Sequence, residues 1–180
     1  MTGRVLVAGV GNIFLGDDGF GVEVAKRLAA TDLPSWVQVA DYGISGMHLA
    51  YDLADGYETA ILIDTARRGE RPGTLTVIEA GRPEETGAVA ESRLFDAHGM
   101  QPDVVLGVLE MLGAASARVL VVGCEPASLD YGMELSEPVA AAVGEAVQAV
   151  IRLIAEIGAD AAIAASSSGE GALYVPRHTR

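Results

Sequence analysis

Cysteine is almost absent from this sequence: Cys124 stands alone, so no disulfide can form within the chain. A chain without disulfides suits a reducing cytoplasm. Cys124 follows the apolar run 119–123, and a thiol in that setting is more often buried and inert than nucleophilic. Basic residues are scarce too, with 12 Lys and Arg against 25 Asp and Glu and a formal net charge of −13. Nucleic acids and anionic membranes need clustered basic residues, so we expect neither as a partner.

Several signatures of other protein classes are missing. No run reaches the roughly 18 consecutive apolar residues that indicate a membrane span, and the N-terminus lacks the basic and apolar segments of a signal peptide. The Walker phosphate-binding pattern, the H-E-x-x-H zinc motif, zinc-site cysteine spacing and the G-x-S-x-G elbow do not occur. These absences argue against a P-loop nucleotidase and a Ser–His–acid hydrolase, and we expect a cytoplasmic protein.

Apolar residues make up half of the 180-residue chain, which is typical of a parallel α/β sheet covered on both faces. Strands are predicted over 4–9, 36–40, 59–63, 74–79 and 118–123, and helices over 19–30, 46–54, 102–112 and from about Ser136. Only a short polar loop precedes strand 74–79, so we expect it to run antiparallel to strand 59–63. The predicted fold is a three-layer α/β sandwich, with helices on both faces of a mostly parallel, twisted five-stranded sheet that has one antiparallel strand.

The domain organisation follows from the same pattern. Residues 1–158 are predicted to form a single domain. The last predicted helix has one apolar stripe, formed by Val139, Val143, Val147, Val150, Ile151 and Ile154. Residues 159–180 hold an Ala/Ser/Gly-rich tract and are predicted to be a flexible tail.

The turn after the first predicted strand is the most informative segment. Gly9 and Gly11 fit the start of a dinucleotide-binding G-x-G-x-x-G pattern. The third glycine position holds Phe14, where close packing of helix on strand requires glycine. Asp17 and Asp18 then precede the helix, and both would repel a phosphate. A nucleotide-binding, Rossmann-like module is therefore the less favoured interpretation.

Three acidic residues follow the ends of three predicted parallel strands: Asp18, Asp41 and Asp64. Each has an ordinary interpretation when taken alone. One of Asp17 and Asp18 could cap the following helix while the other points outward, and Asp41 and Asp64 could each hold a turn. Taken together, they sit at one edge of the sheet, where ligands of open α/β folds bind. A carboxylate cluster that binds a cation explains all three with one cause.

His98 is the best imidazole to join these acids. It lies at the end of the long polar segment 80–101, directly before a predicted helix, and long irregular loops are often functional. An ordinary solvated surface role is the alternative. His48 lies in a predicted helix and His178 in the predicted tail. Two carboxylates with one imidazole suit a divalent first-row metal ion, and a catalytic zinc ion is also conceivable.

These residues together resemble one family. The segments 7–12 and 17–21 are similar to the opening of the hydrogenase maturation proteases, endopeptidases that remove a C-terminal extension from the large subunit of nickel–iron hydrogenases. The similarity covers roughly residues 4–155 and continues through 41–46, 63–64, 72–74, 98–99 and 123–126. Asp18 stands where some members carry Glu. The loop 84–92 and the tail match nothing in the family pattern, so substrate choice is left open.

The resemblance implies a site and a substrate. The metal-contacting positions of the family fall on Asp18, Asp64 and His98. Nickel is expected to arrive with the large-subunit precursor, as part of the substrate, and the free enzyme is not expected to hold it tightly. The family function implies an aspartyl-type endopeptidase that reads this nickel and cuts near it. The alternative is a self-contained metal-dependent hydrolase.

The sequence does not identify the general base as clearly as it identifies the metal-contacting residues. Asp41 is our candidate, because an acid beside other acids can accept a proton from an attacking water. Holding the turn 43–46 is an equally good role for Asp41. Polarisation of the scissile carbonyl by nickel is a second chemical route.

Overall fold

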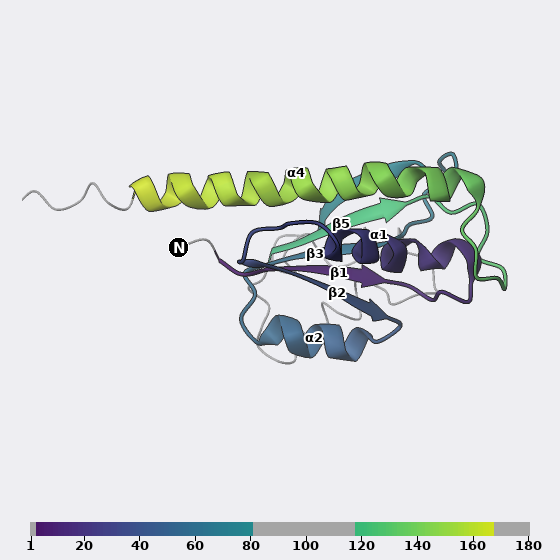
Figure 1. The fold of residues 1–180 in the computed structure, drawn as a ribbon, viewed down its shortest axis with the longest axis horizontal. Coiled ribbons are helices and arrows are strands. Elements are labelled where there is room, and N and C mark those ends of the chain that lie inside the picture. The colour runs from purple at the N-terminus through teal and green to yellow at the C-terminus, as the bar shows by residue number, and fades with distance from the viewer. Residues whose placement is uncertain (1–2, 81–117, 168–180) are drawn as a thin grey trace, which may run out of the picture.

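The computed structural model describes residues 3–80 and 118–167, and in this part of the chain five strands form one sheet (Figure 1). The strand order is β2-β1-β3-β5-β4, where β1 is Val5–Val10, β2 is Val37–Gly43, β3 is Thr59–Thr65, β4 is Leu75–Ala80 and β5 is Arg118–Cys124. The neighbours β2, β1, β3 and β5 pair in parallel, and β4 pairs antiparallel with β5. This confirms the mostly parallel sheet and the direction of its one antiparallel strand.

Helices cover both faces of this sheet. The short 3₁₀ helix η1 (Gly16–Gly19) leads into α1 (Phe20–Ala29), which packs with α4 (Glu137–Ser167) over one face. On the opposite face lies α2 (Gly46–Ala54), as Figure 1 shows. The three-layer sandwich is therefore confirmed. The predicted helix 102–112 lies outside the described residues.

The strand β1 shows why its sequence is continuously apolar. All six of its residues are buried. Val5 and Val7 belong to the core under α1 and α4, whereas Leu6, Ala8 and Val10 belong to the core under α2. Alternate side chains of a strand point to opposite faces, so a strand covered on both sides has no polar position.

Helix α1 approaches the sheet unusually closely at Gly21. A Cβ atom placed there would lie 2.0 Å from the Ile63 carbonyl oxygen and 2.3 Å from that of Val10. The glycine missing at position 14 is thus not needed, because Gly21 on α1 allows the close contact of helix and strand. This contact sets the position of η1 above the ends of β1 and β3.

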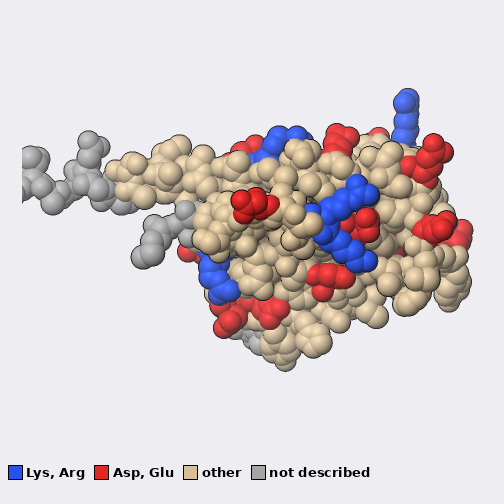
Figure 2. Space-filling model, in the orientation of Figure 1, with Lys and Arg blue, Asp and Glu red and all other residues tan. Residues whose placement is uncertain are grey.

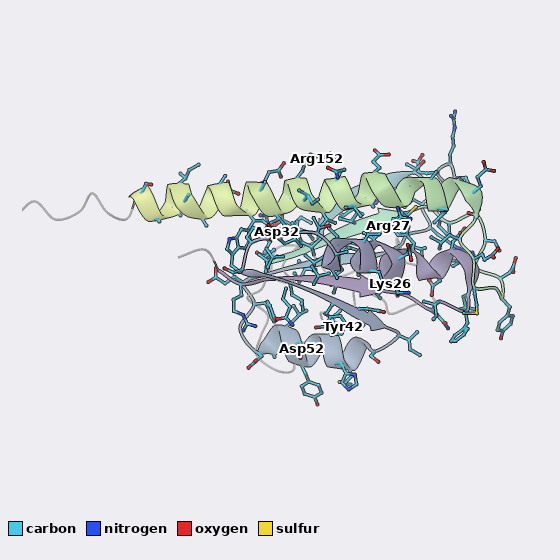
Figure 3. All side chains as sticks on the ribbon, in the orientation of Figure 1. Lys26, Arg27, Asp32, Tyr42, Asp52 and Arg152 are labelled. Atoms are coloured by element: carbon cyan, nitrogen blue, oxygen red, sulfur yellow. The ribbon has the colours of Figure 1, made fainter. Side chains whose placement is uncertain are left out.

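On the other face, α2 is fastened to the sheet by a polar contact. The Tyr42 hydroxyl of β2 donates a hydrogen bond of 2.6 Å to the Asp52 carboxylate of α2, and both residues are labelled in Figure 3. Burial, helped by the neighbouring Asp52 carboxylate, raises the pKa of Tyr42, so the hydroxyl keeps its proton and remains a donor.

Helix α4 has the predicted apolar stripe, and it extends further than predicted, into the segment expected to be a tail. The five buried members of the stripe face the core: Val139, Val143, Val147, Val150 and Ile154. The helix continues to Ser167, so residues 159–167 are helical where the sequence predicted the start of a flexible tail. Alanine is the strongest helix former, which accounts for the extension. Residues 168–180 lie outside the described part.

By length and apolar content, Glu137–Ser166 also matches a membrane-spanning helix. Its buried stripe instead forms part of the domain core, which is the ordinary reason for such a composition.

Candidate functional site

The candidate site begins at the turn that leaves β1. Gly11 has a φ angle of +125°, and a Cβ atom there would lie 1.9 Å from the carbonyl oxygen of Asp18. Only glycine allows both the backbone angle and the close approach. The Asn12 side-chain oxygen then accepts a 3.0 Å hydrogen bond from the Phe14 N–H, which tightens the turn. The chain therefore folds back so that Asp18 lies beside the strand end it has just left.

Asp18 is 2% exposed, and each of its carboxylate oxygens accepts a hydrogen bond. The Asn12 N–H donates to Oδ2 at 2.7 Å, and the Thr65 hydroxyl donates to Oδ1 at 3.1 Å. In a dinucleotide site the backbone N–H groups of this turn would face a phosphate. Here the Asp18 carboxylate takes that place, which gives the physical reason against the nucleotide-binding interpretation.

Asp64 lies next to Asp18, in β3, which adjoins β1 in the sheet. Its side chain is half-buried, and its Oδ1 accepts a 2.7 Å hydrogen bond from the Thr65 N–H. Burial and the negative charge of Asp18 raise the pKa of Asp64 to about 8. A carboxyl group held in this way is poised to give up its proton when a cation arrives. The predicted pairing of Asp18 with Asp64 is therefore present in the structure.

Asp17 has a different role from the predicted one. It is 1% exposed, and it accepts hydrogen bonds from the N–H groups of Ala127, Ser128 and Ser136 and from the Ser136 hydroxyl, at 2.6–3.0 Å. Burial alone would raise the pKa of Asp17, but these hydrogen bonds outweigh it and lower the pKa. Asp17 thus anchors the segment after β5 to η1.

The helix-cap prediction for these two acids is wrong. Gly19 occupies the N-cap position of α1, and no side chain caps either η1 or α1. Neither acid points outward, since both are buried. The reason is that both carboxylates find donors in other parts of the fold, Asp17 in the segment 127–136 and Asp18 at Asn12 and Thr65.

Asp41 lies in β2, opposite Gly9 of β1, where the register shifts by one residue before Gly43. Such bulges are common beside active sites. Its side chain is exposed, and its Oδ1 accepts a 2.9 Å hydrogen bond from the Gly43 N–H. The turn-holding role considered for Asp41 is therefore present.

His98 lies outside the described residues. Within residues 3–80 and 118–167, no group of three or more His, Cys, Asp or Glu side chains is arranged to hold a metal ion. In the same part of the chain the ion pairs are Arg27–Glu23 and Arg118–Glu79, and neither involves Asp18 or Asp64. Within these residues no basic side chain pairs with either acid.

The sequence analysis missed the contacts that Thr65 and Asp17 make. Thr65 contacts both acids, although 47 positions separate it from Asp18. The partners of Asp17 lie 110 or more positions away. Local patterns cannot reveal contacts of this range, and the paired acids at 17 and 18 were the one available signal.

Exposed apolar side chains gather around the same edge of the sheet. They extend from the segments that follow the carboxyl ends of three parallel strands: Ile13 and Phe14 after β1, Ile44 and Met47 after β2, and Tyr131 and Met133 after β5. Tyr131 is 95% exposed. Exposed apolar side chains on neighbouring segments often mark sites of interaction with other molecules.

A hollow of about 380 Å³ adjoins this apolar surface, and its lining includes Ile13, Met133, Lys26 and Arg27. Lys26 and Arg27 extend from α1, as Figure 3 shows, and Figure 2 shows basic side chains together near the middle of this face with acidic ones around them. Arg27 also pairs with Glu23 at 3.3 Å.

Comparison with known proteins agrees with this geometry. The family model described as hydrogenase maturation protease matches residues 22–153. The hydrogenase expression/formation protein HupD of Rhodobacter capsulatus is 31% identical over 169 residues, covering 93% of this chain and 79% of HupD.

Solved structures give the same result. The hydrogenase maturating endopeptidase HybD of Escherichia coli aligns with a TM-score of 0.70 and 30% identity, covering 86% of this chain and 94% of HybD. The hydrogenase 2 maturation peptidase of Thaumarchaeota archaeon SCGC_AB-539-E09 aligns with a TM-score of 0.67 and 35% identity, covering 84% of this chain and 98% of that peptidase. The matches favour neither a nucleotide-binding module nor an unrelated hydrolase. The chain belongs to the hydrogenase maturation proteases and is a peptidase.

Proposed function

We propose that this peptidase removes the C-terminal extension of a nickel–iron hydrogenase large-subunit precursor after nickel insertion. In this proposal Asp18, Asp64 and His98 contact the nickel ion that the precursor carries, and this contact holds the scissile bond in the site. The reaction belongs to the cytoplasm, in keeping with a chain that has a single cysteine. The family membership and the edge geometry support the proposal.

The observation that carries the proposal is the Asp18–Asp64 pair. Two adjacent carboxylates, one buried and one half-buried, repel each other unless a cation or a proton neutralises them. A metal ion held by the precursor supplies that cation only when the correct substrate is present. Oxygen ligands and one imidazole hold nickel weakly by themselves, and cysteine thiolates on the precursor would supply the remaining ligands.

The exposed apolar side chains around the site support a macromolecular substrate. A small-molecule site is usually a closed pocket, whereas here exposed side chains such as Phe14 and Tyr131 extend from the segments that follow β1 and β5. A folded precursor can cover these side chains while its extension reaches the site. Positioning of the bond is then the main contribution to catalysis.

Asp41 is the proposed general base. Its hydrogen bond with the Gly43 N–H leaves it exposed and orients the carboxylate. Asp41→Asn keeps an oxygen acceptor for that bond but cannot take a proton, so processing is expected to fall by roughly 10²–10⁴-fold. Processing by Asp41→Asn at the wild-type rate would favour polarisation of the carbonyl by nickel and leave Asp41 with its turn-holding role.

The site assignment is tested by processing of a nickel-loaded large-subunit precursor, followed by mass spectrometry. Asp64→Asn and His98→Ala are each expected to abolish cleavage, since each removes one nickel contact. The charge-matched control is Asp160→Asn, because Asp160 is an exposed acid of α4, far from Asp64 in the sequence. This variant should cleave the precursor at the wild-type rate. Undiminished cleavage by both site variants would refute the assignment.

Nickel recognition needs a separate test. The metal-free precursor is expected to stay uncleaved by the wild-type protein, and addition of nickel to the precursor should restore cleavage. Metal analysis of the purified peptidase should find little bound metal. Tightly retained metal together with cleavage of the metal-free precursor would instead support a self-contained metal-dependent hydrolase.

A further inference from the structure

Thr65, the last residue of β3, donates two hydrogen bonds to the acid pair. Thr65 donates through its backbone N–H to Asp64 Oδ1 at 2.7 Å, and through its hydroxyl to Asp18 Oδ1 at 3.1 Å. Thr65 is half-buried and pairs with Cys124 of β5, so its backbone is fixed within the sheet. A single rigid residue therefore contacts both members of the acid pair.

We propose that Thr65 is a positioning residue of this peptidase, which holds the carboxylates of Asp18 and Asp64 in the arrangement that receives the metal ion of the substrate. This inference rests on the proposed function and extends it to a residue outside the set of nickel contacts. Thr65 itself does not touch the metal. Its two hydrogen bonds act through the acids.

The hydrogen-bond count explains why this arrangement leaves the acids able to bind a cation. An ionised carboxylate has about four lone-pair sites. Asp18 uses one on each oxygen, for Asn12 and Thr65. The remaining lone pairs are available for a metal ion, while the two donors fix the rotation of the carboxylate. Outer partners of this kind orient metal ligands, and their loss typically costs about 10–100-fold in metal affinity or activity.

The contact with Asp18 depends on the hydroxyl alone. In Thr65→Val the backbone N–H still donates to Asp64, but a methyl group replaces the hydroxyl that donates to Asp18 Oδ1 and also interacts with the Asp64 carboxyl group. Thr65→Ser keeps the hydroxyl and removes only a methyl group. Thr76→Val is the matched control, because Thr76 is also half-buried in a strand of the same sheet, in β4.

The first measurement is processing kinetics with nickel-loaded precursor. Contact with the nickel is made before and during cleavage, so its loss should raise KM more than it lowers kcat. For Thr65→Val we expect KM to rise by about 10–100-fold, whereas Thr65→Ser and Thr76→Val should remain close to wild type. A purely structural role would lower the active fraction, and hence kcat, without a change in KM.

The second measurement needs no precursor. Paramagnetic broadening of amide NMR signals during titration with NiCl₂ reports weak nickel binding near Asn12, Asp18 and Thr65. Thr65→Val is expected to need about 10-fold more nickel for the same broadening, with Thr65→Ser restoring the wild-type response. An unchanged KM and an unchanged nickel titration in Thr65→Val would overturn the inference.

Asp64→Asn in the same assays separates this inference from the proposed function. Loss of cleavage in Asp64→Asn with normal behaviour of Thr65→Val would refute the role of Thr65 alone. Normal cleavage by Asp64→Asn would remove Asp64 from the nickel contacts and, with it, the basis of the Thr65 assignment.

Discussion

The carboxylate of Asp17 accepts four hydrogen bonds from a segment more than 100 positions away in the chain. Asp17→Asn leaves one oxygen acceptor and turns an amide donor toward N–H groups that are themselves donors. Since hydrogen bonds to a charged group contribute about 1.5–3 kcal/mol each, we expect the free energy of unfolding to fall by roughly 3 kcal/mol. Urea unfolding measures this difference. A loss within about 0.5 kcal/mol, as for ordinary surface substitutions, would contradict the anchoring role.

The same residue predicts a pH dependence. The pKa of Asp17 is lower in the folded protein than in the unfolded chain, so its contribution to stability is complete above the unfolded value of about 3.9 and is lost as the pH falls through the folded value. The stability difference between wild type and Asp17→Asn should therefore be constant above about pH 5 and shrink below about pH 4. Urea unfolding curves measured over this pH range test the prediction. A stability difference between wild type and Asp17→Asn that grows toward acid pH would contradict it.

Cys124 provides a chemical prediction. Its thiol is fully buried, and burial together with the nearby carboxylates of Asp17 and Glu125 raises the pKa to about 12. Because the thiolate is the reactive form, iodoacetamide at pH 8 should leave the native protein unmodified and label it in guanidinium chloride. Rapid labelling of the native protein would indicate an accessible thiol, contrary to the inert role that the sequence predicted.

At the scale of single elements, replacing either of two helix glycines by alanine is expected to change stability in opposite directions. Gly21→Ala in α1 would place a methyl group against the carbonyl oxygens of Ile63 and Val10, so stability should fall at the upper end of the roughly 1–3 kcal/mol cost of overpacking. Gly144→Ala in α4 meets no atom within 4 Å and should raise stability by about 0.5–1 kcal/mol through helix propensity. Thermal unfolding of both variants provides the comparison. Equal effects of the two changes would show that close packing of α1 on the sheet is unimportant.

The elements also show what sequence alone can predict. Apolar runs and turn residues located the five strands, α1, α2 and the start of α4 to within a few positions, because burial on both faces of a parallel sheet leaves a strong local pattern. They missed η1 and the extension of α4 to Ser167. The parallel edge further predicted that Asp18 and Asp64 lie together. The pattern could not predict the insertion of β5 between β3 and β4, the burial of Asp17 or the contact of Thr65 with Asp18, since each depends on residues far apart in the chain.

At the scale of the whole molecule, the domain boundary at residue 158 stays a prediction. The last fully buried side chain of α4 is Ile154, and the helix beyond residue 158 is mostly exposed. A chain ending at residue 158 should therefore keep its unfolding midpoint in urea and its processing rate. Loss of processing with unchanged stability would instead assign the removed residues to precursor recognition.

The strand order has a consequence for biosynthesis. On the ribosome β4 is made before β5, yet β5 is its partner within the described sheet, and the donors that hold Asp17 follow β5 in the chain. A nascent chain that stops short of residue 118 therefore lacks the strand that joins β3 to β4, and one that stops short of residue 127 leaves Asp17 without the bonds that secure η1. Domains usually fold as whole units. The edge that carries Asp17 and Asp18 is thus completed only after the segment 127–136 has been made, so a copy that ends before this segment is expected to lack processing activity.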